Sequence, residues 1–570
     1  MVSAEQIKVS RLLEGAKRLQ VPLFQRPYSW ERPEWQQLWD DIVRLAHERR
    51  RLGANETHFI GPVVLAPAPM NSAALPSFIV VDGQQRLTTI TLLLAAIRDH
   101  REEEEGIDPD EISNQYLVNQ YATADANRLK FQPTRKDLDE YASHIVGNAS
   151  QTRTDLTGAY KFFRKKLQSS APDDVELESE AQESAAEIQE AILFGAELVL
   201  ITTQQGDNPH RIFESLNNKG RPLTQADLLR NYLFMRLPTT GEKVHAKYWI
   251  DLDSMFTPEQ LTLLFWLDLV QSDETIRQSE TFVQQQRRFD RLTSEAEVAA
   301  EIGRIAALGP LLMRILEPEN ESDEHVRKRL QRLHEWGTTT VYPILLHLLM
   351  LRERRKANDK QIATAMLYLE SYFVRRLVIG RTTMNINRVL LRAAQEVPVD
   401  SKPDEALKTY LSRGQKYWAT DAEVLAAAMT SPVYHHGKAH QKRLILTWIE
   451  ESLPHKERNL DSVRLTIEHV MPQTLSPVWQ AEIEATMSKT DRAAYVHDEV
   501  VNTLGNLTLT AYNSELSNRS FDEKKSAWLG DSNLQLNREI AKHKHWGAKE
   551  IRTRGRLLAT RMNSLWPGPA

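Results

Sequence analysis

In the first 240 residues, segments with the hydrophobic pattern of a strand alternate with segments that have the pattern of a helix. Short apolar runs rich in β-branched residues predict strands, and longer runs of helical period predict helices between them. We therefore expect an α/β unit, in which the first two strands form a hairpin or adjacent strands. The predicted strands are residues 58–66, 77–81 and 197–203, with a strand and turn at 128–139. The predicted helices are a short amphipathic one within residues 1–22, then 34–50, 87–97, 209–220 and one that opens at Thr224.

Residues 240–450 carry an almost purely helical pattern, and from about residue 455 the pattern changes again. The expected helix breaks are at Pro258, Pro310, Pro318, Pro343 and Pro398–Pro403. Beyond them, Ser462–Val470 alternates like a strand, Val500–Thr510 contains a second strand, and Ala511–Lys525 resembles a short helix. We expect three domains, at residues 1–237, 238–454 and 455–570.

A polar junction separates the predicted strand 77–81 from the predicted helix 87–97. It consists of Asp82, Gly83, Gln84, Gln85 and Arg86. The first N–H groups of a helix are unpaired and its dipole is positive there, so such a junction suits an anion. Arginine can fork onto phosphate, and glutamine can donate and accept hydrogen bonds. From these residues alone, an ordinary polar turn is the simpler interpretation.

Two further segments admit either a ligand site or a structural role. In FQRPYSW, residues 24–30, the proline predicts a turn. Aromatic side chains beside an arginine can stack on a base or line a phosphate site, and they can equally anchor a loop. Asn217, close to a glycine, and Asp227, three residues after Thr224, can contact a ligand or cap a helix.

Composition narrows the classes of protein. The chain has 570 residues, of which 41% are hydrophobic and 26% charged, as in ordinary multidomain proteins. It has no cysteine, which excludes disulfides, thiolate metal sites and cysteine nucleophiles and fits a cytoplasmic location. No apolar run reaches the ~18 residues of a membrane span, and the N-terminus lacks the apolar core of a secretory signal. The net charge of −5 means that any DNA contact depends on local basic patches.

Four motifs together resemble the GmrSD-type family, whose relatives include the BrxU and SspE restriction factors. In chain order they are FQRPYSW at 24–30, VDGQQRLTT at 81–89, IFESLNNKGRPLTQADLLRNYL at 212–233, and IEHVMPQ at 467–473 followed by LGNLTLTAYNSELSN at 504–518. One motif alone would be weak evidence. Four in order, spanning about residues 20 to 530, identify the chain as similar to this family.

The resemblance implies an α+β multidomain, mostly helical protein whose residues 1–237 adopt a ParB/sulfiredoxin-like nucleotide-binding fold. It implies that GTP or ATP is bound and hydrolysed there, and that the segment 24–30 beside this site recognises modified DNA. The implied nucleotide-binding residues are Asp82, Gly83, Gln84, Gln85, Arg86, Asn217 and Asp227. The implied modification-sensing residues are Gln25, Arg26, Tyr28 and Trp30.

The C-terminal strand–strand–helix pattern resembles a ββα-metal, or HNH, nuclease domain. By the family pattern His469 is the general base, Glu468 and Asn513 are ligands of Mg²⁺ or Mn²⁺, and Asn506 holds the hairpin against the helix. Neutral histidine can take a proton from water, and carboxylate and amide oxygens are hard ligands. Two positions depart from the commonest pattern, since glutamate precedes the histidine where aspartate is frequent, and asparagine replaces a third-position histidine.

Two basic segments also have two interpretations. Lys542–Arg561 carries seven Lys/Arg and one Glu, so it can be a phosphate-binding stripe, an amphipathic closing helix, or both. Its expected apolar face is Ile551, Leu557, Leu558 and Met562. Arg375 and Arg376, inside an apolar stretch, can satisfy a buried carboxylate, reach out to solvent, or contact a phosphate.

The resulting hypothesis is a modification-dependent DNA endonuclease or nickase of a bacterial anti-phage restriction system. It would cut double-stranded, modified phage DNA, with NTP turnover at the Asp82–Arg86 site gating metal-dependent cleavage. Association into a homo-oligomer is compatible with the sequence, and no membrane partner is expected. The rival hypothesis is a nucleotide-switched DNA-binding or adaptor protein whose nuclease fold does not cut. In a third hypothesis the Asp82–Arg86 site binds DNA or a modified base and hydrolyses nothing.

Overall fold

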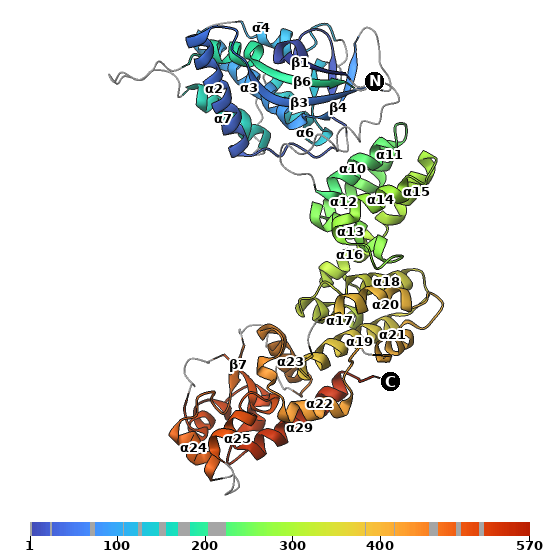
Figure 1. Ribbon diagram of the computed structural model, residues 1–570, viewed down its shortest axis with the longest axis vertical. Coiled ribbons are helices and arrows are strands. Elements are labelled where there is room, and N and C mark those ends of the chain that lie inside the picture. The colour runs from blue at the N-terminus through green and yellow to red at the C-terminus, as the bar shows by residue number, and fades with distance from the viewer. Residues whose placement is uncertain are drawn as a thin grey trace, which may run out of the picture. The chain divides into compact units, whose positions relative to one another are not determined.

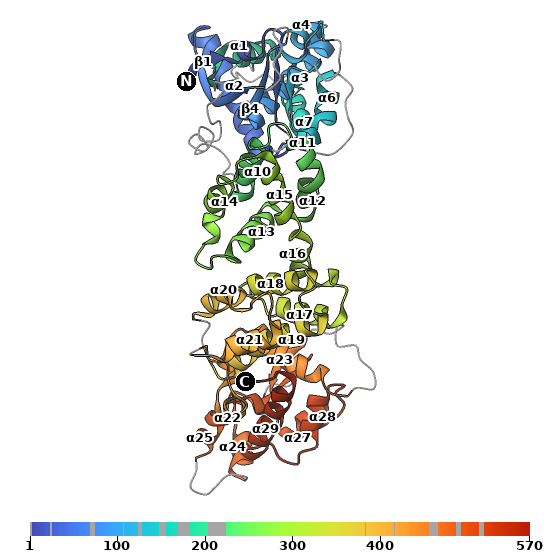
Figure 2. The same ribbon diagram turned by 90° about the vertical axis from the view of Figure 1, so that its right-hand side faces the viewer.

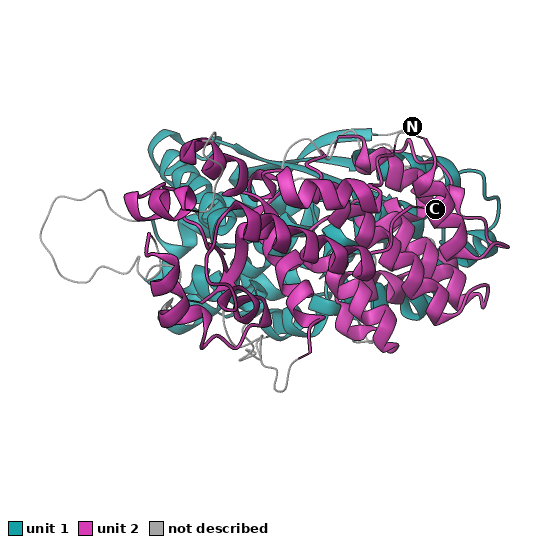
Figure 3. Cartoon of the chain, turned by 90° about the horizontal axis from the view of Figure 1, so that it is seen from below, with its two compact units in different colours: residues 1–262, 279–303 teal, residues 263–278, 304–570 magenta. Residues whose placement is uncertain are grey.

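A computed structural model of the chain forms two compact units, coloured separately in Figure 3. Unit 1 comprises residues 1–262 and 279–303, and unit 2 comprises residues 263–278 and 304–570. The structure describes residues 3–22, 25–68, 75–105, 108–122, 128–146, 155–168, 183–202, 224–381, 384–414, 416–454, 465–485, 492–511 and 518–569. No helix in these ranges is both long and apolar enough to cross a membrane.

Unit 1 is built on a six-stranded mixed sheet with the strand order β1-β6-β3-β4-β2-β5 (Figure 1). Its strands are β1 (Ser3–Lys8), β2 (Arg18–Gln20), β3 (His58–Pro67), β4 (Ser77–Asp82), β5 (Phe131–Gln132) and β6 (Ala196–Thr202). β3 and β4 pair antiparallel, β3 and β6 pair parallel, and β2 lies parallel to both β4 and β5. The predicted pairing of the two strands around residues 58–81 is therefore confirmed.

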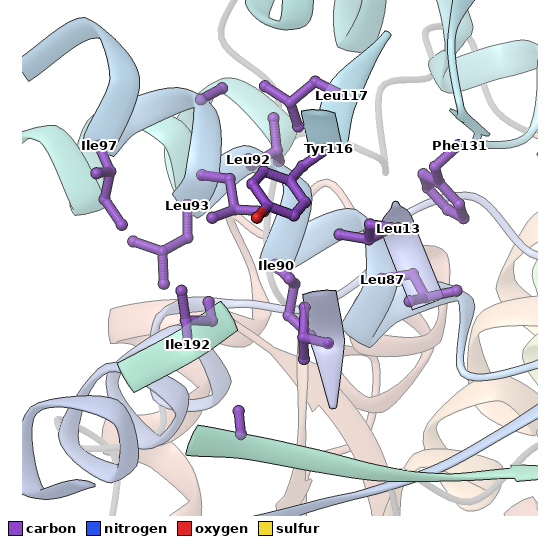
Figure 4. Close-up of a cluster of buried hydrophobic side chains, with 14 of the residues drawn as sticks. Leu13, Leu87, Ile90, Leu92, Leu93, Ile97, Tyr116, Leu117, Phe131 and Ile192 are labelled. Atoms are coloured by element: carbon purple, nitrogen blue, oxygen red, sulfur yellow. The ribbon is translucent and has the colours of Figure 1, made fainter. Parts of the chain in front are cut away.

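The main core of unit 1 is organised around α3. Every residue from Leu87 to Arg98 is buried, so this helix is covered on all sides, as its apolar sequence predicts. Its side chains pack with Leu13, Tyr116, Phe131 and Ile192 (Figure 4). The helices of this part are α1 (Val9–Leu13), α2 (Arg32–Leu52), α3 (Gln84–Glu105), α4 (Asp110–Ile112), α6 (Arg135–Val146), α7 (Asp155–Gln168) and α8 (Ala185–Glu190).

A second, smaller apolar cluster joins the sheet to the helix that follows it. Val64, Val81 and Ile201 form this cluster, and Leu228 and Met235 of α10 pack on it. The helices of this part are α10 (Gln225–Met235), α11 (Gly241–Val244), α12 (Ile250–Met255), α13 (Pro258–Val270), α14 (Thr281–Phe289) and α15 (Glu295–Ala306). Because α10 packs on the sheet, α10 to α12 and α14 belong to the same unit as the sheet, whereas one boundary between the two units falls inside α13, after Thr262.

The first 22 residues differ from the prediction. They contain the predicted short helix as the five-residue α1, but two strands that were not predicted, β1 and β2, flank it. β1 pairs antiparallel with β6 along its whole length, from Ser3 opposite Thr202 to Lys8 opposite Glu197. The strand β1 was missed because its partner lies nearly two hundred residues away, and local periodicity carries no information about it.

Unit 2 is helical (Figure 2), and its described residues also contain a two-stranded antiparallel sheet, of which β7 is labelled in Figure 1. Prolines stand in the first turns of three helices, as the predicted breaks require. The helices are α16 (Gly309–Leu316), α17 (Glu324–Glu335), α18 (Tyr342–Glu353), α19 (Asp359–Val378), α20 (Ile386–Glu396), α21 (Pro403–Ser412), α22 (Asp421–Thr430), α23 (Ala439–Glu451), α24 (Pro477–Glu484), α25 (Ala493–Val500), α27 (Phe521–Lys524), α28 (Gln535–Ala541) and α29 (Ala548–Leu565). The strands β7 (Thr466–His469) and β8 (Leu507–Thr510) pair antiparallel.

The end of the chain is fastened to the middle of unit 2. The fully buried Trp566 donates its indole N–H to Glu370 of α19 at 2.5 Å, and Arg375 Nε donates to the Trp566 carbonyl at 2.7 Å. α29 also packs along α22 and against α23. Residues on both sides of the expected boundary at 454/455 therefore share one compact unit, because these contacts join them.

Candidate functional site

The segment containing Gln25–Trp30 is clamped by the two glutamines of the Asp82–Arg86 junction. Gln84 donates to the Arg26 carbonyl at 3.1 Å. Gln85 donates to the Pro27 carbonyl at 3.1 Å and accepts from the Ser29 amide at 2.8 Å. Both predicted motifs thus meet in space, as the resemblance implies. In this structure the side-chain amides of Gln84 and Gln85 bind the backbone of the loop. Their expected contacts with a nucleotide stay a prediction.

Gln25 and Tyr28 are also turned inward. Gln25, which is buried, donates to the carbonyls of Val80 and Val81, both at 2.9 Å. The Tyr28 hydroxyl lies 2.7 Å from Thr89 Oγ1 and accepts from Trp35 Nε1 at 2.9 Å. Burial raises the pKa of the Tyr28 hydroxyl. These two side chains hold the loop on β4 and α3, which leaves Arg26 and the half-buried Trp30 as its more accessible members.

Arg86 and Asp82 form the charged part of the junction. Arg86 donates to the Pro62 carbonyl at 2.8 Å and lies directly over Gly61, where a Cβ atom would stand 2.5 Å from its guanidinium. Burial lowers the pKa of Arg86, and Asp82 works against this. Burial raises the pKa of Asp82, opposed by a hydrogen bond from the Gly83 amide and by Arg86 and Arg26. Gly83 has φ of +93°, a conformation that glycine adopts readily.

A cleft of ≈ 920 Å³ opens beside the loop, within unit 1. Gln25–Ser29, Thr134–Lys136 and parts of α10 to α13 line it. Its lining contains residues of both charges. The basic ones are Arg26, Arg135, Lys136 and Arg230, and the acidic ones are Asp227, Glu242, Asp253 and Glu259. The cleft therefore brings Arg26 together with Asp227, from two separate motifs. Asp82 and Gln84–Arg86 are not among its described lining residues. The side chains of Gln84 and Gln85 are bonded to the backbone of the loop that lines the cleft.

Asp227 performs the capping role that its spacing predicts. Its Oδ2 accepts from the Thr224 amide at 3.1 Å and the Thr224 hydroxyl at 2.9 Å, while the Asp227 amide donates to Thr224 Oγ1. Its other oxygen lies 3.9 Å from Arg230 Nη1, and Arg230 pairs with Asp253 at 2.5 Å. Asn217 and the predicted helix 209–220 lie outside the described residues.

The second candidate site is the β7–β8 hairpin of unit 2. Its register places His469 opposite Leu507 and Glu468 opposite Thr508. Gly505, just before β8, lies against the backbone of α29, where a Cβ atom would stand 2.0 Å from the Ile551 carbonyl oxygen. The glycine of GNLTL is therefore required for close packing between the hairpin and α29. Since neighbouring strand residues face opposite sides, Glu468 and His469 point into different surroundings.

His469 is buried and held by groups from outside the predicted motifs. Its Nε2 lies 3.2 Å from Asn502 Oδ1, and its ring meets the Tyr434 ring edge-on with centroids 4.4 Å apart. An amide oxygen only accepts, so the facing Nε2 carries the hydrogen and Nδ1 keeps its lone pair. Burial lowers the pKa of His469 to about 4, opposed by the Asn502 bond and reinforced by Lys524, His435 and His497. A neutral imidazole with Nδ1 free of a hydrogen is the form that accepts a proton.

Glu468 makes a buried ion pair with Lys524 of α27. Lys524 Nζ donates to Glu468 Oε1 at 2.8 Å and to the His469 carbonyl at 2.9 Å. The Lys524 side chain is 0% exposed and that of Glu468 only 8%. Burial raises the pKa of Glu468, and the ammonium group opposes this shift. One lysine therefore ties both residues of the predicted Glu-His pair to the following helix.

Asn506 uses its whole side chain to hold strand ends together. Its Nδ2 donates to the carbonyls of Met471 and Val501, both at 2.8 Å. Its Oδ1 accepts from the Met471 amide at 2.8 Å and from Trp546 Nε1 at 3.1 Å. With every donor and acceptor of the amide engaged, Asn506 positions the β7–β8 hairpin instead of contacting a substrate.

The donor chemistry around Glu468 is compatible with a hard divalent ion. Mg²⁺ is usually held by one or two carboxylates plus water, and Glu468 Oε2 has no partner within the described part of the chain. Asn513, the other predicted ligand, lies outside the described residues. Within the described ranges no three His, Asp or Glu side chains gather as a metal cluster.

Sequence reasoning missed three residues of this site. Asn502, Tyr434 and Lys524 reach His469 or Glu468 from three different elements. Tyr434 lies in the 3-10 turn Val433–His435, ahead of the expected nuclease boundary. None of them carries a local signal, since an asparagine, a tyrosine or a lysine at such positions is ordinary surface composition.

The basic segments are largely structural. In α29, Arg554 is buried and donates to the carbonyls of Gly505 and Leu507, and Arg561 pairs with Glu539. The expected apolar face holds except at Leu557, which is 54% exposed. Arg375 is buried and donates to the carbonyls of Trp566 and Ala419, whereas the carboxylate it pairs with, Asp421, is 67% exposed. The arginine is therefore structural, but its buried acceptors are backbone carbonyls and not a buried carboxylate.

Two family models match the chain. One, described as the N-terminal domain of GmrSD restriction endonuclease, matches residues 9–234. The other, described as the C-terminal domain of GmrSD restriction endonucleases, matches residues 418–561. The Asp82–Arg86 junction and the Glu468–His469 pair lie inside the matched segments, which places the chain among the restriction endonucleases. It belongs to the GmrSD-type family. No curated protein matches the chain.

Proposed function

We propose that the chain is a modification-dependent DNA endonuclease or nickase of a bacterial anti-phage restriction system. The observation that carries the proposal is His469, held neutral at the end of β7 with Nε2 bonded to Asn502 and Nδ1 free of a hydrogen. The family models support a restriction nuclease acting on DNA. Modification dependence, the anti-phage role, nicking, metal dependence and control by NTP are the parts that we add.

In the proposed reaction His469 Nδ1 takes a proton from the water that attacks the scissile phosphorus. The P–O bond to the leaving oxygen breaks, and solvent returns a proton to that oxygen. Asn502 would stabilise the imidazolium through the Nε2–H bond, and Lys524 would hold the end of β7 in place through the His469 carbonyl. When bound by Glu468 and Asn513, Mg²⁺ or Mn²⁺ would supply positive charge that offsets the charge on the phosphate.

We further propose that GTP or ATP binds at the N-terminal site and regulates cleavage. Arg86, Asp82 and Asp227 are the groups proposed to act on it, and Arg26 is proposed to contact the modified DNA. Arg86 would neutralise phosphate oxygens, and Asp82 would bind the nucleoside, a water or a metal ion. The loop 25–30 lies between the junction and the cleft, so modified DNA bound in the cleft would act on the nucleotide through Gln84 and Gln85.

The decisive experiment is plasmid nicking with Mg²⁺ or Mn²⁺, on unmodified and modified DNA, with and without NTP. His469→Ala is expected to abolish nicking, and His545→Ala, an exposed histidine of the same unit, serves as the matched control. Nicking by His469→Ala at the wild-type rate contradicts the assignment of the base. Arg86→Ala is expected to stop NTP turnover, and unchanged turnover contradicts the nucleotide assignment.

One observation favours a second function. The Lys524 ammonium lies 2.8 Å from the carboxylate that would bind the metal, and a second cation is repelled there. A nucleotide-switched DNA-binding or adaptor protein with a non-catalytic nuclease fold fits this pairing. Such a protein binds the plasmid at every divalent-metal concentration without producing nicks, so a metal titration of the same assay separates the two functions.

A further inference from the structure

An open groove of ≈ 820 Å³ lies between α20 and α21 in unit 2. Its basic lining residues are Arg388, Arg392, Lys402, Arg413 and Lys416. Only two acidic residues, Glu396 and Glu405, line the same groove. The groove therefore has an excess of positive charge, although the whole chain carries a net charge of −5.

Both acidic residues are already neutralised by neighbours on their own segments. Glu396 accepts from Arg392 Nε at 2.9 Å, and Glu405 accepts from Lys402 Nζ at 2.8 Å. Three cations remain, Arg388, Arg413 and Lys416, and none of them has a carboxylate partner in the described part of the chain. Surplus cations that converge on one groove without internal counterions suit an external polyanion.

Lys416 shows that these charges are held close together. Its ammonium lies 4.3 Å from the centre of the Tyr410 ring and donates to the Arg413 carbonyl at 2.7 Å. Burial lowers the pKa of Lys416, Glu396 opposes this, and repulsion from Arg392 and Arg413 lowers it further. The fold thus maintains a cluster of like charges against their mutual repulsion, which an anionic ligand would relieve.

We propose that the α20–α21 groove binds the sugar-phosphate backbone of duplex DNA. Unit 2 also contains the matched endonuclease segment, which begins shortly after α21. α20 has 11 residues, or about 16 Å of helix, which corresponds to about five phosphates along one strand. Guanidinium groups fork onto phosphate oxygens without reading sequence. The proposal rests on the DNA substrate of the proposed function, and not on cleavage.

The test is DNA binding by the full chain without divalent metal, so that no cutting interferes. Binding would be measured by fluorescence anisotropy of a labelled 30-bp duplex, a length of roughly three helical turns. The salt concentration would be varied from about 50 to 300 mM, because binding through phosphate contacts weakens steeply with salt whereas apolar contacts do not. The variant Arg388→Gln/Arg413→Gln removes two exposed cations of the groove. Arg354→Gln/Arg355→Gln, directly after α18, makes the same charge change at two exposed residues that do not line the groove.

The groove variant is expected to lower the steepness of log K against log salt by about 1.8, which is roughly 60-fold weaker binding at 0.1 M salt. The control variant should retain the wild-type slope. Wild-type binding by the groove variant, or an equal loss in the control, overturns the proposal. Displacement of the duplex by a polyglutamate chain of equal charge at equal concentration overturns the assignment to DNA. If His469→Ala stops nicking while the groove variant binds DNA as the wild type does, the proposal that the groove binds DNA is refuted and the proposed nuclease function stands.

Discussion

Replacing Lys524 by methionine should strongly destabilise unit 2. The Lys524 ammonium is fully buried and serves two acceptors, Glu468 Oε1 at 2.8 Å and the His469 carbonyl at 2.9 Å. Methionine fills a similar volume but carries no charge and no donor. The substitution therefore leaves the Glu468 carboxylate buried without its partner, beside a carbonyl that has lost a hydrogen bond.

The size of the effect follows from the burial of both partners. Removing one member of a buried ion pair costs about 3–5 kcal/mol, whereas replacing both by apolar residues is often close to neutral. We expect Lys524→Met to lose about 4 kcal/mol of unfolding free energy, which is roughly 7 °C in the midpoint for a unit of this size. The double variant Glu468→Met/Lys524→Met should recover most of this loss.

Calorimetry of the full chain measures the thermal transition assigned to unit 2. Lys544→Met, which removes an exposed lysine of the same unit, is the control and should stay within about 0.5 kcal/mol of the wild type. The reasoning is refuted if Lys524→Met is as stable as the control. It is equally refuted if the double variant is no more stable than the single one, because the loss would then not come from an uncompensated carboxylate.

Three more outcomes follow from the same structure. Asn502→Ala removes one hydrogen bond from His469, so kcat for nicking should fall about 2- to 12-fold with little change in KM, and a larger KM effect contradicts a positioning role. Because the folded pKa of His469 is about 4, against about 6.5 when unfolded, nicking should stay constant from pH 8 down to about 5. A tenfold loss by pH 5.5 contradicts this. The neutral histidine contributes stability that is fully present above its unfolded pKa, and roughly 3 kcal/mol of it is lost as the pH falls from about 6.5 to about 4, measurable by urea unfolding. Gly61→Ala would displace the Arg86 guanidinium and should weaken NTP binding about as much as Arg86→Ala. NTP binding at the wild-type affinity would show that Arg86 does not contact the nucleotide.

Local pattern was sufficient for elements whose apolar face or caps are encoded within a few residues. The buried run of α3, the pairing of β3 with β4, the proline-started helices and the Thr224–Asp227 cap all followed from it. The same pattern failed within residues 1–22, where β1 depends on a distant partner, and at Leu557, which the helix leaves in solvent. A periodicity indicates which residues can share one face of a helix or strand, but not whether another element packs on that face and buries it.

The sequence by itself determined the family, through four motifs in order, and the residue types of both candidate sites. Only the tertiary structure decided what each side chain does. It turned Gln84 and Gln85 to the backbone of the loop 25–30, and it engaged every polar atom of the Asn506 amide. It also brought Asn502 and Lys524 to the Glu468–His469 pair from separate segments. The physical reason is that hydrogen bonds and ion pairs depend on distance in space, and a linear pattern records distance only along the chain.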